Sequence, residues 1–319
     1  MQREIYERIA EKANTMEARE ETIAYLAQHL GGFLRSGERV LICFLDYYEG
    51  SIGWLMEQAV LRCEAEPIVW GPDHRWKTLL RLAFANRITA IIGPPLVILG
   101  LSKICKYRQI PLYVRKVVTA GYPCLDWMIE GIATGLDCEA GGCFSLDQTG
   151  VVAGFACGKS WGVHLRQDAY GVDIVDASGN ILPDGQTGRI VLYPKDDPTL
   201  RLETGDRAYK LTAKCRCGSP TPRLLGFYPT SLADPDLLEL GQMLQSWTSI
   251  LDCHVHKGAN GLEMEIVYFQ GEKLPNLPTA AKLVLRPWDP ETDEPLPYDP
   301  TFGFAKKSID NSTLCARIQ

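Results

Sequence analysis

The stretch "RVLICFL", residues 39–45, is predicted to be a buried β-strand because six of its seven side chains are apolar. A continuous apolar run of this length is typical of a strand covered on both faces, as in a parallel sheet. Residues 3–35 before it are rich in Glu, Ala, Arg and Leu at helical spacing, and residues 53–64 after it show a second helical pattern. We therefore expect the strand to lie between helices.

The same alternation continues to about residue 135. Further strands are predicted at "EPIVWG" (66–71), "ITAIIG" (88–93) and "VRKVVTAG" (114–121). Further helices are predicted over about 75–86 and 127–135. Strands and helices that alternate in this way form βαβ units, so we expect an α/β fold with a mainly parallel sheet.

The pattern changes near residue 165. The segment "YGVDIVDASGNILPDGQTGRIVLYP" (170–194) alternates apolar and polar residues around Ser-Gly-Asn and Asp-Gly turns, which predicts antiparallel hairpins. Later, residues 234–251 form an amphipathic helical pattern and residues 261–269 a strand pattern, which indicates a small α+β domain. The predicted domains are residues 1–225 and residues 226–319.

Charge and apolar patterning exclude some classes of partner. The formal charge of the 319 residues is −6, with 33 basic and 39 acidic side chains and no long block of one sign, so we expect neither nucleic acid nor a membrane as partner. The first 20 residues are charged throughout, unlike a signal peptide. The longest apolar run, residues 88–101, is too short for a membrane span and is interrupted by glycine and proline. These features predict a cytoplasmic protein.

The eleven cysteines are odd in number and scattered, which argues against a disulfide framework. Cys157, His164, Cys215 and Cys217 together supply the donors of a closed tetrahedral Cys3His zinc site, which would be structural because all four positions are filled by protein. Cys-x-Cys is a looser signal than Cys-x-x-Cys. The alternative is that the two close cysteines flank a surface turn while His164 lies on a strand.

Two other polar groups have two interpretations each. Asp206 follows Thr204 and Gly205, where we expect a tight turn after a strand; its carboxylate could cap that turn or accept both hydroxyls of a ribose. His254 and His256 are predicted to share a face of a strand, which could be a simple exposed face or could bind a metal. Spacing alone leaves both questions open.

Five runs occur in the order and spacing seen in phenylacetate-CoA ligases. They are "VVTAGYP" (117–123), "GGCFSLDQTG" (141–150), "GVHLRQDAYGVDIVDASGNILPDGQTGRIVLYP" (162–194), "RLETGD" (201–206) and "CRCGSPTPR" (215–223). The chain thus resembles this branch of the adenylate-forming acyl-CoA synthetases over roughly residues 15–226. The resemblance implies a truncated adenylate-forming large domain, with an antiparallel β-rich subdomain, followed by a small C-terminal domain.

The resemblance also implies roles for individual residues. Adenine and the acyl phosphate would be contacted by the loop with Gly121, Tyr122 and Pro123, adenine would stack on Phe144, and Asp206 would bind the ribose hydroxyls. The acid-substrate pocket would be lined by Tyr47, Tyr48, Gly141 and Gly142. Members of this branch bind structural zinc through a set that matches Cys157, His164, Cys215 and Cys217.

Three departures from the family concern the triphosphate. Residues 16–30 match the helix that follows the family's phosphate loop, so we expect a chain shortened at its N-terminal side and lacking that loop. The family's magnesium-holding glutamate matches Gln148, and an amide is a poorer magnesium ligand than a carboxylate. The arginine of the family's hinge motif matches Phe227. Together they predict impaired ATP-driven ligation.

The sequence therefore predicts an AMP-binding, acyl-CoA-ligase-like protein that acts on or binds an aryl or acyl carboxylate, or its adenylate or CoA ester. Structural zinc, AMP or ATP, and CoA are the expected cofactors. If the protein is active, a partner chain could supply the missing phosphate loop, and a partner chain or a second copy could cover the shortened side. The alternative is a non-catalytic pseudoenzyme, a zinc-stabilised interaction or scaffold protein.

Overall fold

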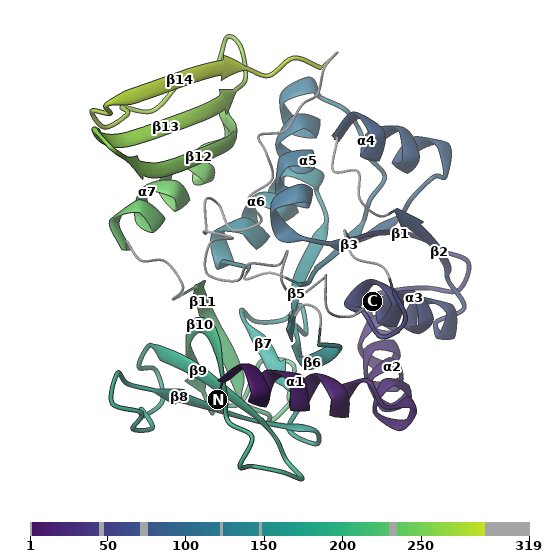
Figure 1. Ribbon diagram of the computed structural model, residues 1–319. Coiled ribbons are helices and arrows are strands. Elements are labelled where there is room, and N and C mark those ends of the chain that lie inside the picture. The colour runs from purple at the N-terminus through teal and green to yellow at the C-terminus, as the bar shows by residue number, and fades with distance from the viewer. Residues whose placement is uncertain are drawn as a thin grey trace.

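The computed structural model describes residues 2–44, 48–70, 76–121, 124–146, 149–229 and 235–290. Within these residues the chain forms an eleven-stranded sheet in the order β2-β1-β3-β4-β5-β6-β7-β11-β10-β9-β8 and a separate sheet in the order β12-β13-β14 (Figure 1). No helix in the described part of the chain is long and apolar enough to cross a membrane. This arrangement confirms the predicted α/β fold.

The first half of the large sheet is parallel, as predicted. Its strands are β1 (Arg39–Cys43), β2 (Glu66–Trp70), β3 (Ala90–Gly93), β4 (Lys116–Thr119) and β5 (Glu139–Leu146). Successive side chains of β1 enter different cores: Val40 and Ile42 pack on one face of the sheet, Leu41 and Cys43 on the other. Burial on both faces explains why β1 lacks polar alternation.

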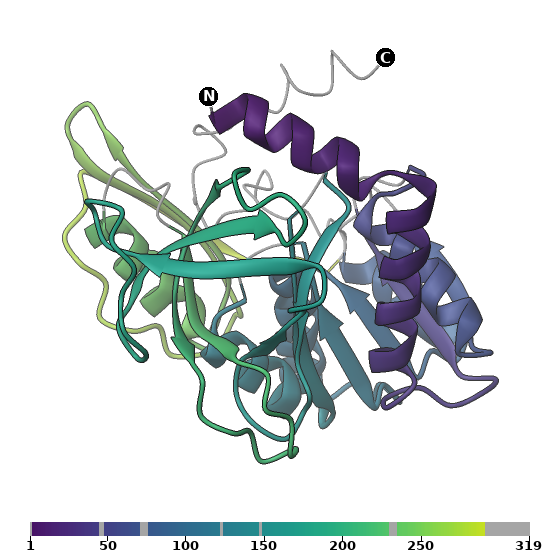
Figure 2. The ribbon, with the colours of Figure 1, turned by 90° about the horizontal axis from the view of Figure 1, so that it is seen from below.

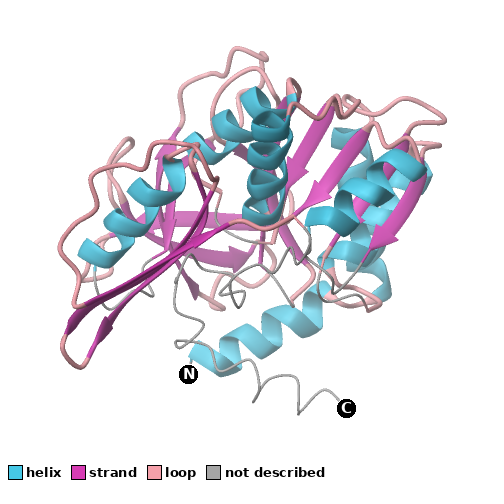
Figure 3. Cartoon of the chain, turned by 90° about the horizontal axis from the view of Figure 1, so that it is seen from above, coloured by secondary structure: helices cyan, strands magenta, loops and turns pink. Residues whose placement is uncertain are grey.

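Helices cover both faces of this parallel half (Figure 3). One face packs against α2 (Met16–Leu30) and α3 (Ile52–Arg62). The other packs against α4 (Trp76–Ala85), α5 (Pro95–Arg108) and α6 (Asp126–Leu136). The predicted helical segment 3–35 divides at Asn14, and Thr15 begins α2 by accepting a hydrogen bond from the backbone N–H of Ala18 at 3.2 Å.

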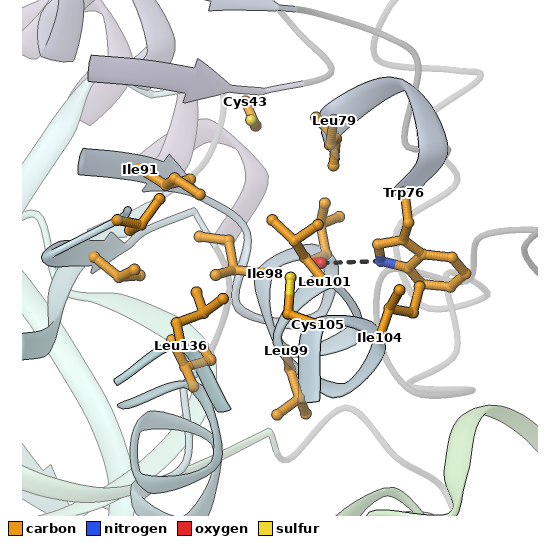
Figure 4. Close-up of a cluster of buried hydrophobic side chains, with 14 of the residues drawn as sticks. Cys43, Trp76, Leu79, Ile91, Ile98, Leu99, Leu101, Ile104, Cys105 and Leu136 are labelled. Carbon is orange, nitrogen blue, oxygen red and sulfur yellow. Dashed lines mark hydrogen bonds between the residues drawn. The ribbon is translucent and has the colours of Figure 1, made fainter. Parts of the chain in front are cut away.

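Helix α5 was not predicted, because its apolar residues run on from β3 without helical periodicity. Ten of its fourteen residues are buried, which accounts for the missing pattern. Pro95 occupies the first turn, where a proline needs no hydrogen-bond donor. The indole N–H of Trp76 donates to the carbonyl of Val97 at 3.0 Å (Figure 4). A Cβ on Gly100 would lie within 2.5 Å of the Trp76 ring. The packing of α4 on α5 therefore requires glycine there.

The second half of the large sheet is antiparallel. Its strands are β6 (Val151–Phe155), β7 (Val163–Leu165), β8 (Tyr170–Val175), β9 (Gly188–Pro194), β10 (Leu202–Leu211) and β11 (Arg223–Pro229). The hairpin predicted over 170–194 is the β8–β9 pair. Helix α1 (Gln2–Ala13) lies across these strands and buries Ile9 in their core (Figure 2).

A small lobe, residues 235–290, follows the large sheet. It contains α7 (Pro235–Ser246), β12 (Ile250–Gly258), β13 (Gly261–Tyr268) and β14 (Lys282–Pro287). Strands β12 and β13 are antiparallel, whereas β13 and β14 are parallel. The domain boundary predicted between residues 225 and 226 falls on β11, and the division into domains stays a prediction.

Candidate functional site

Gly121 lies just beyond the carboxyl end of β4, beside β5. Its φ of +83° is a conformation that favours glycine. Its backbone N–H donates to the hydroxyl of Ser145 on β5 at 3.1 Å. A Cβ here would approach the ring of Phe44 to 3.3 Å. The loop after β4 is therefore tied to the end of the neighbouring parallel strand, where α/β sheets place ligands.

Phe144 precedes Ser145 on β5 and is buried. Only 6% of Phe144 is exposed, and its ring centroid lies 5.2 Å from that of Phe227, at 46°. Phe227 comes from β11 and is 9% exposed. The aromatic side chain expected to stack on adenine is thus covered by the side chain at the position of the family's hinge arginine.

Asp206 lies inside β10 rather than in a turn after a strand, which corrects the prediction of a tight turn. The register of β10 on β9 shifts between Glu203 and Arg207, and Gly205 in this bulge has φ +82°. The positive φ and the bulge are the turn-like features that the Thr-Gly-Asp pattern indicated. The backbone N–H of Asp206 donates to the Thr204 hydroxyl at 3.2 Å.

The carboxylate of Asp206 accepts no hydrogen bond from any residue that the structure describes. Among the described residues no hydrogen-bond donor or cation contacts it, and burial raises its pKa to about 7. Asp206 pairs across the ladder with Pro229, so it shares a face of β10–β11 with Phe227. A half-buried carboxylate without a donor, beside an aromatic pair, is a candidate binding group.

The residues predicted for the substrate pocket are distributed over two places. Gly141 and Gly142 lie inside β5 opposite Val118 and Thr119, and a Cβ on Gly141 would come within 3.2 Å of the Cβ of Ala156. Tyr48 precedes α3 and is 42% exposed. The remaining predicted residues, Tyr47, Tyr122 and Pro123, and the departure at Gln148, lie outside the described residues.

The four predicted zinc ligands converge. Cys157 follows β6, His164 lies on β7, and Cys215 and Cys217 lie in the turn between β10 and β11. Their donor atoms all lie within 4.8 Å of one another. The Sγ atoms of Cys157 and Cys215 are 3.6 Å apart, and Sγ of Cys217 is 3.4 Å from Nε2 of His164. Cysteines 58 residues apart in sequence are thus brought together.

Neighbouring groups orient these donors. Nδ1 of His164 lies 2.8 Å from the hydroxyl of Thr221 and 3.2 Å from its carbonyl oxygen, so a proton on Nδ1 leaves Nε2 directed at the thiols. Burial raises the pKa of the Cys215 thiol, but hydrogen bonds, first among them that from the backbone N–H of Cys217, outweigh burial and lower the pKa to about 6. Thr221 was not anticipated, because only its place in space makes it a partner of His164.

The two strand histidines do share a face, as predicted. The rings of His254 and His256 stack at 4.9 Å, and Nε2 of His256 is 3.4 Å from a carboxylate oxygen of Glu263. The closely spaced metal-donor group found in the described residues is the Cys157, His164, Cys215 and Cys217 set, and it does not include these histidines. The exposed-face interpretation fits them.

Comparison with solved structures identifies the fold. A 2-hydroxyisobutyryl-CoA ligase in complex with an acyl-AMP superimposes with a TM-score of 0.65, at 14% identity over 93% of this chain and 72% of that chain. An anthranilate CoA ligase with anthranoyl-AMP gives 0.57, at 14% identity over 92% and 64%. A benzoate CoA ligase from Burkholderia xenovorans gives 0.56, at 12% identity over 91% and 65%.

The fold is that of AMP-binding acyl-CoA ligases. Neither a protein-family model nor a curated protein matches the sequence. At 12 to 14% identity the likeness establishes the fold, and the phenylacetate-CoA ligase branch stays a prediction.

Proposed function

We propose that the protein binds an adenylate, and that it acts on or holds an acyl or aryl carboxylate in the form of its adenylate or CoA ester. The observation that carries the proposal is the carboxylate of Asp206, half-buried and without a donor among the described residues. Two ribose hydroxyls would supply the missing donors, and an ionised carboxylate accepts both. The acyl-AMP ligands in structures of the same fold support this choice.

The remaining predicted residues take supporting roles in the proposal. Gly121, held by Ser145, would place its loop against the acyl phosphate, and Phe144 would offer a face to adenine. The acid would lie toward Tyr48, Gly141 and Gly142. We propose that ATP-driven ligation is impaired, because Gln148 and Phe227 replace an acid and an arginine of the family's triphosphate machinery.

We further propose that Cys157, His164, Cys215 and Cys217 hold a structural zinc ion. A tetrahedral ion with Zn–S bonds of about 2.3 Å has ligand atoms roughly 3.8 Å apart. Two of the observed separations, 3.6 Å and 3.4 Å, are near this value, and all four donor atoms lie within 4.8 Å of one another. With four protein donors the ion would have no open position, so it would fix the turn between β10 and β11 rather than take part in chemistry.

The covered ring of Phe144 favours a second candidate, a non-catalytic interaction or scaffold protein with this fold. If the Phe144–Phe227 contact is permanent, adenine has no aromatic face on which to stack. The fold would then serve as a frame for binding another protein. A protein of this kind would bind neither AMP nor ATP.

Calorimetric titration of AMP, and then ATP, into zinc-replete protein tests the proposal. We expect AMP to bind and Asp206→Ala to abolish binding. Asp196→Ala is the matched control, because Asp196 is an exposed aspartate on the surface, where it pairs with Lys12 on α1. Failure of both nucleotides to bind the unsubstituted protein would rule out the adenylate site and favour the scaffold. Equal AMP binding by Asp206→Ala would instead show that Asp206 does not bind the ribose.

A further inference from the structure

Helix α5 carries a lysine that reaches into the small lobe. Lys103 is 7% exposed, and its ammonium group donates to the carbonyl oxygens of Gln245 and, at 2.7 Å, Ile250. Gln245 lies in the last turn of α7, where carbonyls lack partners inside the helix, and Ile250 begins β12. A cation at a helix C-terminus also opposes the helix dipole favourably. One side chain of the large lobe thus donates hydrogen bonds to carbonyl oxygens of two elements of the small lobe.

The surroundings of Lys103 make this contact hard to give up. Within the described residues no carboxylate lies at ion-pair distance from its Nζ, and desolvation lowers its pKa to about 8. The nearby Asp252 carboxylate accepts hydrogen bonds from the Gln245 side chain at 3.2 Å and the Cys253 backbone at 2.9 Å. If the small lobe moved away, the ammonium group would lose both acceptors while still bordered by an apolar core.

A second contact lies one turn further along α5. The ring of Tyr107 stacks on that of Phe269 at 4.3 Å and 15°, and its hydroxyl donates to the carbonyl of Gln270 at 2.7 Å. Phe269 is 1% exposed and also meets Trp288 edge-on at 5.7 Å. Leu251 and Val267 of the small lobe are buried in the same hydrophobic cluster as α5. In Figure 1 the three-stranded sheet lies beside α5 accordingly.

We infer that Lys103 and Tyr107 form a latch, here called the α5 latch, that fixes the small lobe on the large one. Lobes joined through modest polar interfaces usually move relative to each other. Here a buried ammonium group, an aromatic stack and a shared hydrophobic core join the two lobes. Separating the lobes would expose apolar surface and leave the Lys103 ammonium group without acceptors. We therefore expect the two lobes to unfold as one cooperative unit.

Calorimetry and hydrogen exchange on the full chain test the α5 latch, independently of any nucleotide binding. We expect one thermal transition for the unsubstituted protein. Lys103→Met keeps the apolar stem and removes the donors, and should speed exchange of the small-lobe amides on the order of tenfold, more than it speeds exchange in β1 and β3. Lys106→Met, an exposed lysine on the same helix, is the control and should leave exchange unchanged.

Two outcomes overturn the latch: separate melting of the two lobes in the unsubstituted protein, or exchange in Lys103→Met equal to that of the Lys106→Met control. Should Lys103→Met fail to fold, Tyr107→Phe decides the matter. It retains the stacked ring and loses the hydrogen bond to Gln270, so small-lobe exchange should rise several-fold. Unchanged exchange in Tyr107→Phe would then count against the latch.

Discussion

Strand β10 connects two regions that differ in how their polar groups are satisfied. At the turn after β10, the Cys215 thiol accepts a hydrogen bond from a backbone N–H and lies 3.6 Å from that of Cys157. A hydrogen bond to Thr221 orients His164. Inside β10, Asp206 has a bulge beneath it and no donor among the described residues. In the first region the thiols and the imidazole hold one another in place. In the second, the Asp206 carboxylate is an acceptor without a described donor.

This difference suits the first region to stabilising the fold and the second to binding a ligand. With the proposed zinc ion bound, a closed donor set that joins β6, β7 and the β10–β11 turn would stabilise the antiparallel half of the sheet. An ionisable group held without a partner costs stability, and proteins retain such groups where a ligand completes them. We therefore expect loss of a cluster donor and loss of the Asp206 charge to change the free energy of unfolding in opposite directions.

The largest effect is expected at the cluster. Cys215→Ser removes one of four donors and should lower the free energy of unfolding by at least about 4 kcal/mol, because metal binding and folding of such a region are coupled. The melting temperature should fall by roughly 10 °C. The zinc content, measured by elemental mass spectrometry, should drop below the one equivalent expected for the unsubstituted protein. Chelation of the unsubstituted protein should reproduce the loss.

Cys63→Ser is the matched control for this change. Cys63 lies outside the cluster at the end of α3, where it packs at the edge of a hydrophobic core and its thiol donates to the carbonyl of Ala27 at 3.4 Å. The zinc content of Cys63→Ser should stay at one equivalent, and its melting temperature should lie within about 2 °C of that of the unsubstituted protein. Full stability of Cys215→Ser without metal would show that the four donors are not a structural site.

Asp206→Asn should raise the free energy of unfolding at neutral pH and above, the opposite of the effect of Cys215→Ser. Burial raises the pKa of Asp206 from 3.8 to about 7, so the folded state holds a proton that the unfolded state releases at lower pH. Stability that Asp206 contributes below pH 4 is therefore lost as pH rises to 7. Fully expressed, the difference is about 4 kcal/mol; water reaching the half-buried group reduces the expected gain of Asp206→Asn at pH 8 to ~2 kcal/mol.

Denaturant unfolding of both proteins between pH 4 and pH 8 measures this difference. The two curves should converge near pH 4 and separate progressively toward pH 8. Asp184→Asn is the control, since Asp184 is exposed and accepts a hydrogen bond from the backbone N–H of Thr212 at 2.7 Å. Parallel curves for Asp206→Asn, or a less stable variant at pH 8, would mean that the Asp206 carboxylate is satisfied in solution.

Local pattern predicts much of this fold and of the cluster. Continuous apolar runs indicate β1 to β4, and the Asp-Gly turn indicates the β8–β9 hairpin. The donor types of Cys157, His164 and the Cys-x-Cys pair point to a common site despite their separation, because few structures other than a metal site use that combination. These signals depend on residue type, which the sequence states directly.

Features that depend on distant neighbours escape such reasoning. Helix α5 is buried on nearly every side, so it has no amphipathic period to detect. The bulge at Asp206 arises from how β10 pairs with β9. The acceptors of Lys103 lie 142 and 147 residues further along the chain. Each requires knowledge of which elements are adjacent, and that knowledge comes only from the assembled structure.

The smallest effect concerns Phe227, and its sign decides what the second region does. Its ring covers Phe144, and an aromatic pair of this kind contributes about 0.5–1.5 kcal/mol beyond the area it buries. If adenine must displace Phe227 to stack on Phe144, Phe227→Ala should tighten AMP binding about fivefold while costing ~3 kcal/mol of stability. Calorimetric titration measures the first effect, and thermal melting the second.

Phe33→Ala controls for the loss of a buried ring elsewhere, since Phe33 packs edge-on against Phe155 at 6.1 Å, away from β10. It should lower stability comparably and leave AMP affinity unchanged. Weaker binding by Phe227→Ala would instead make Phe227 a second stacking surface for the purine, and the covered pair would be a site already assembled. Unchanged binding would remove Phe144 from the adenine site and leave Asp206 as the group that defines it.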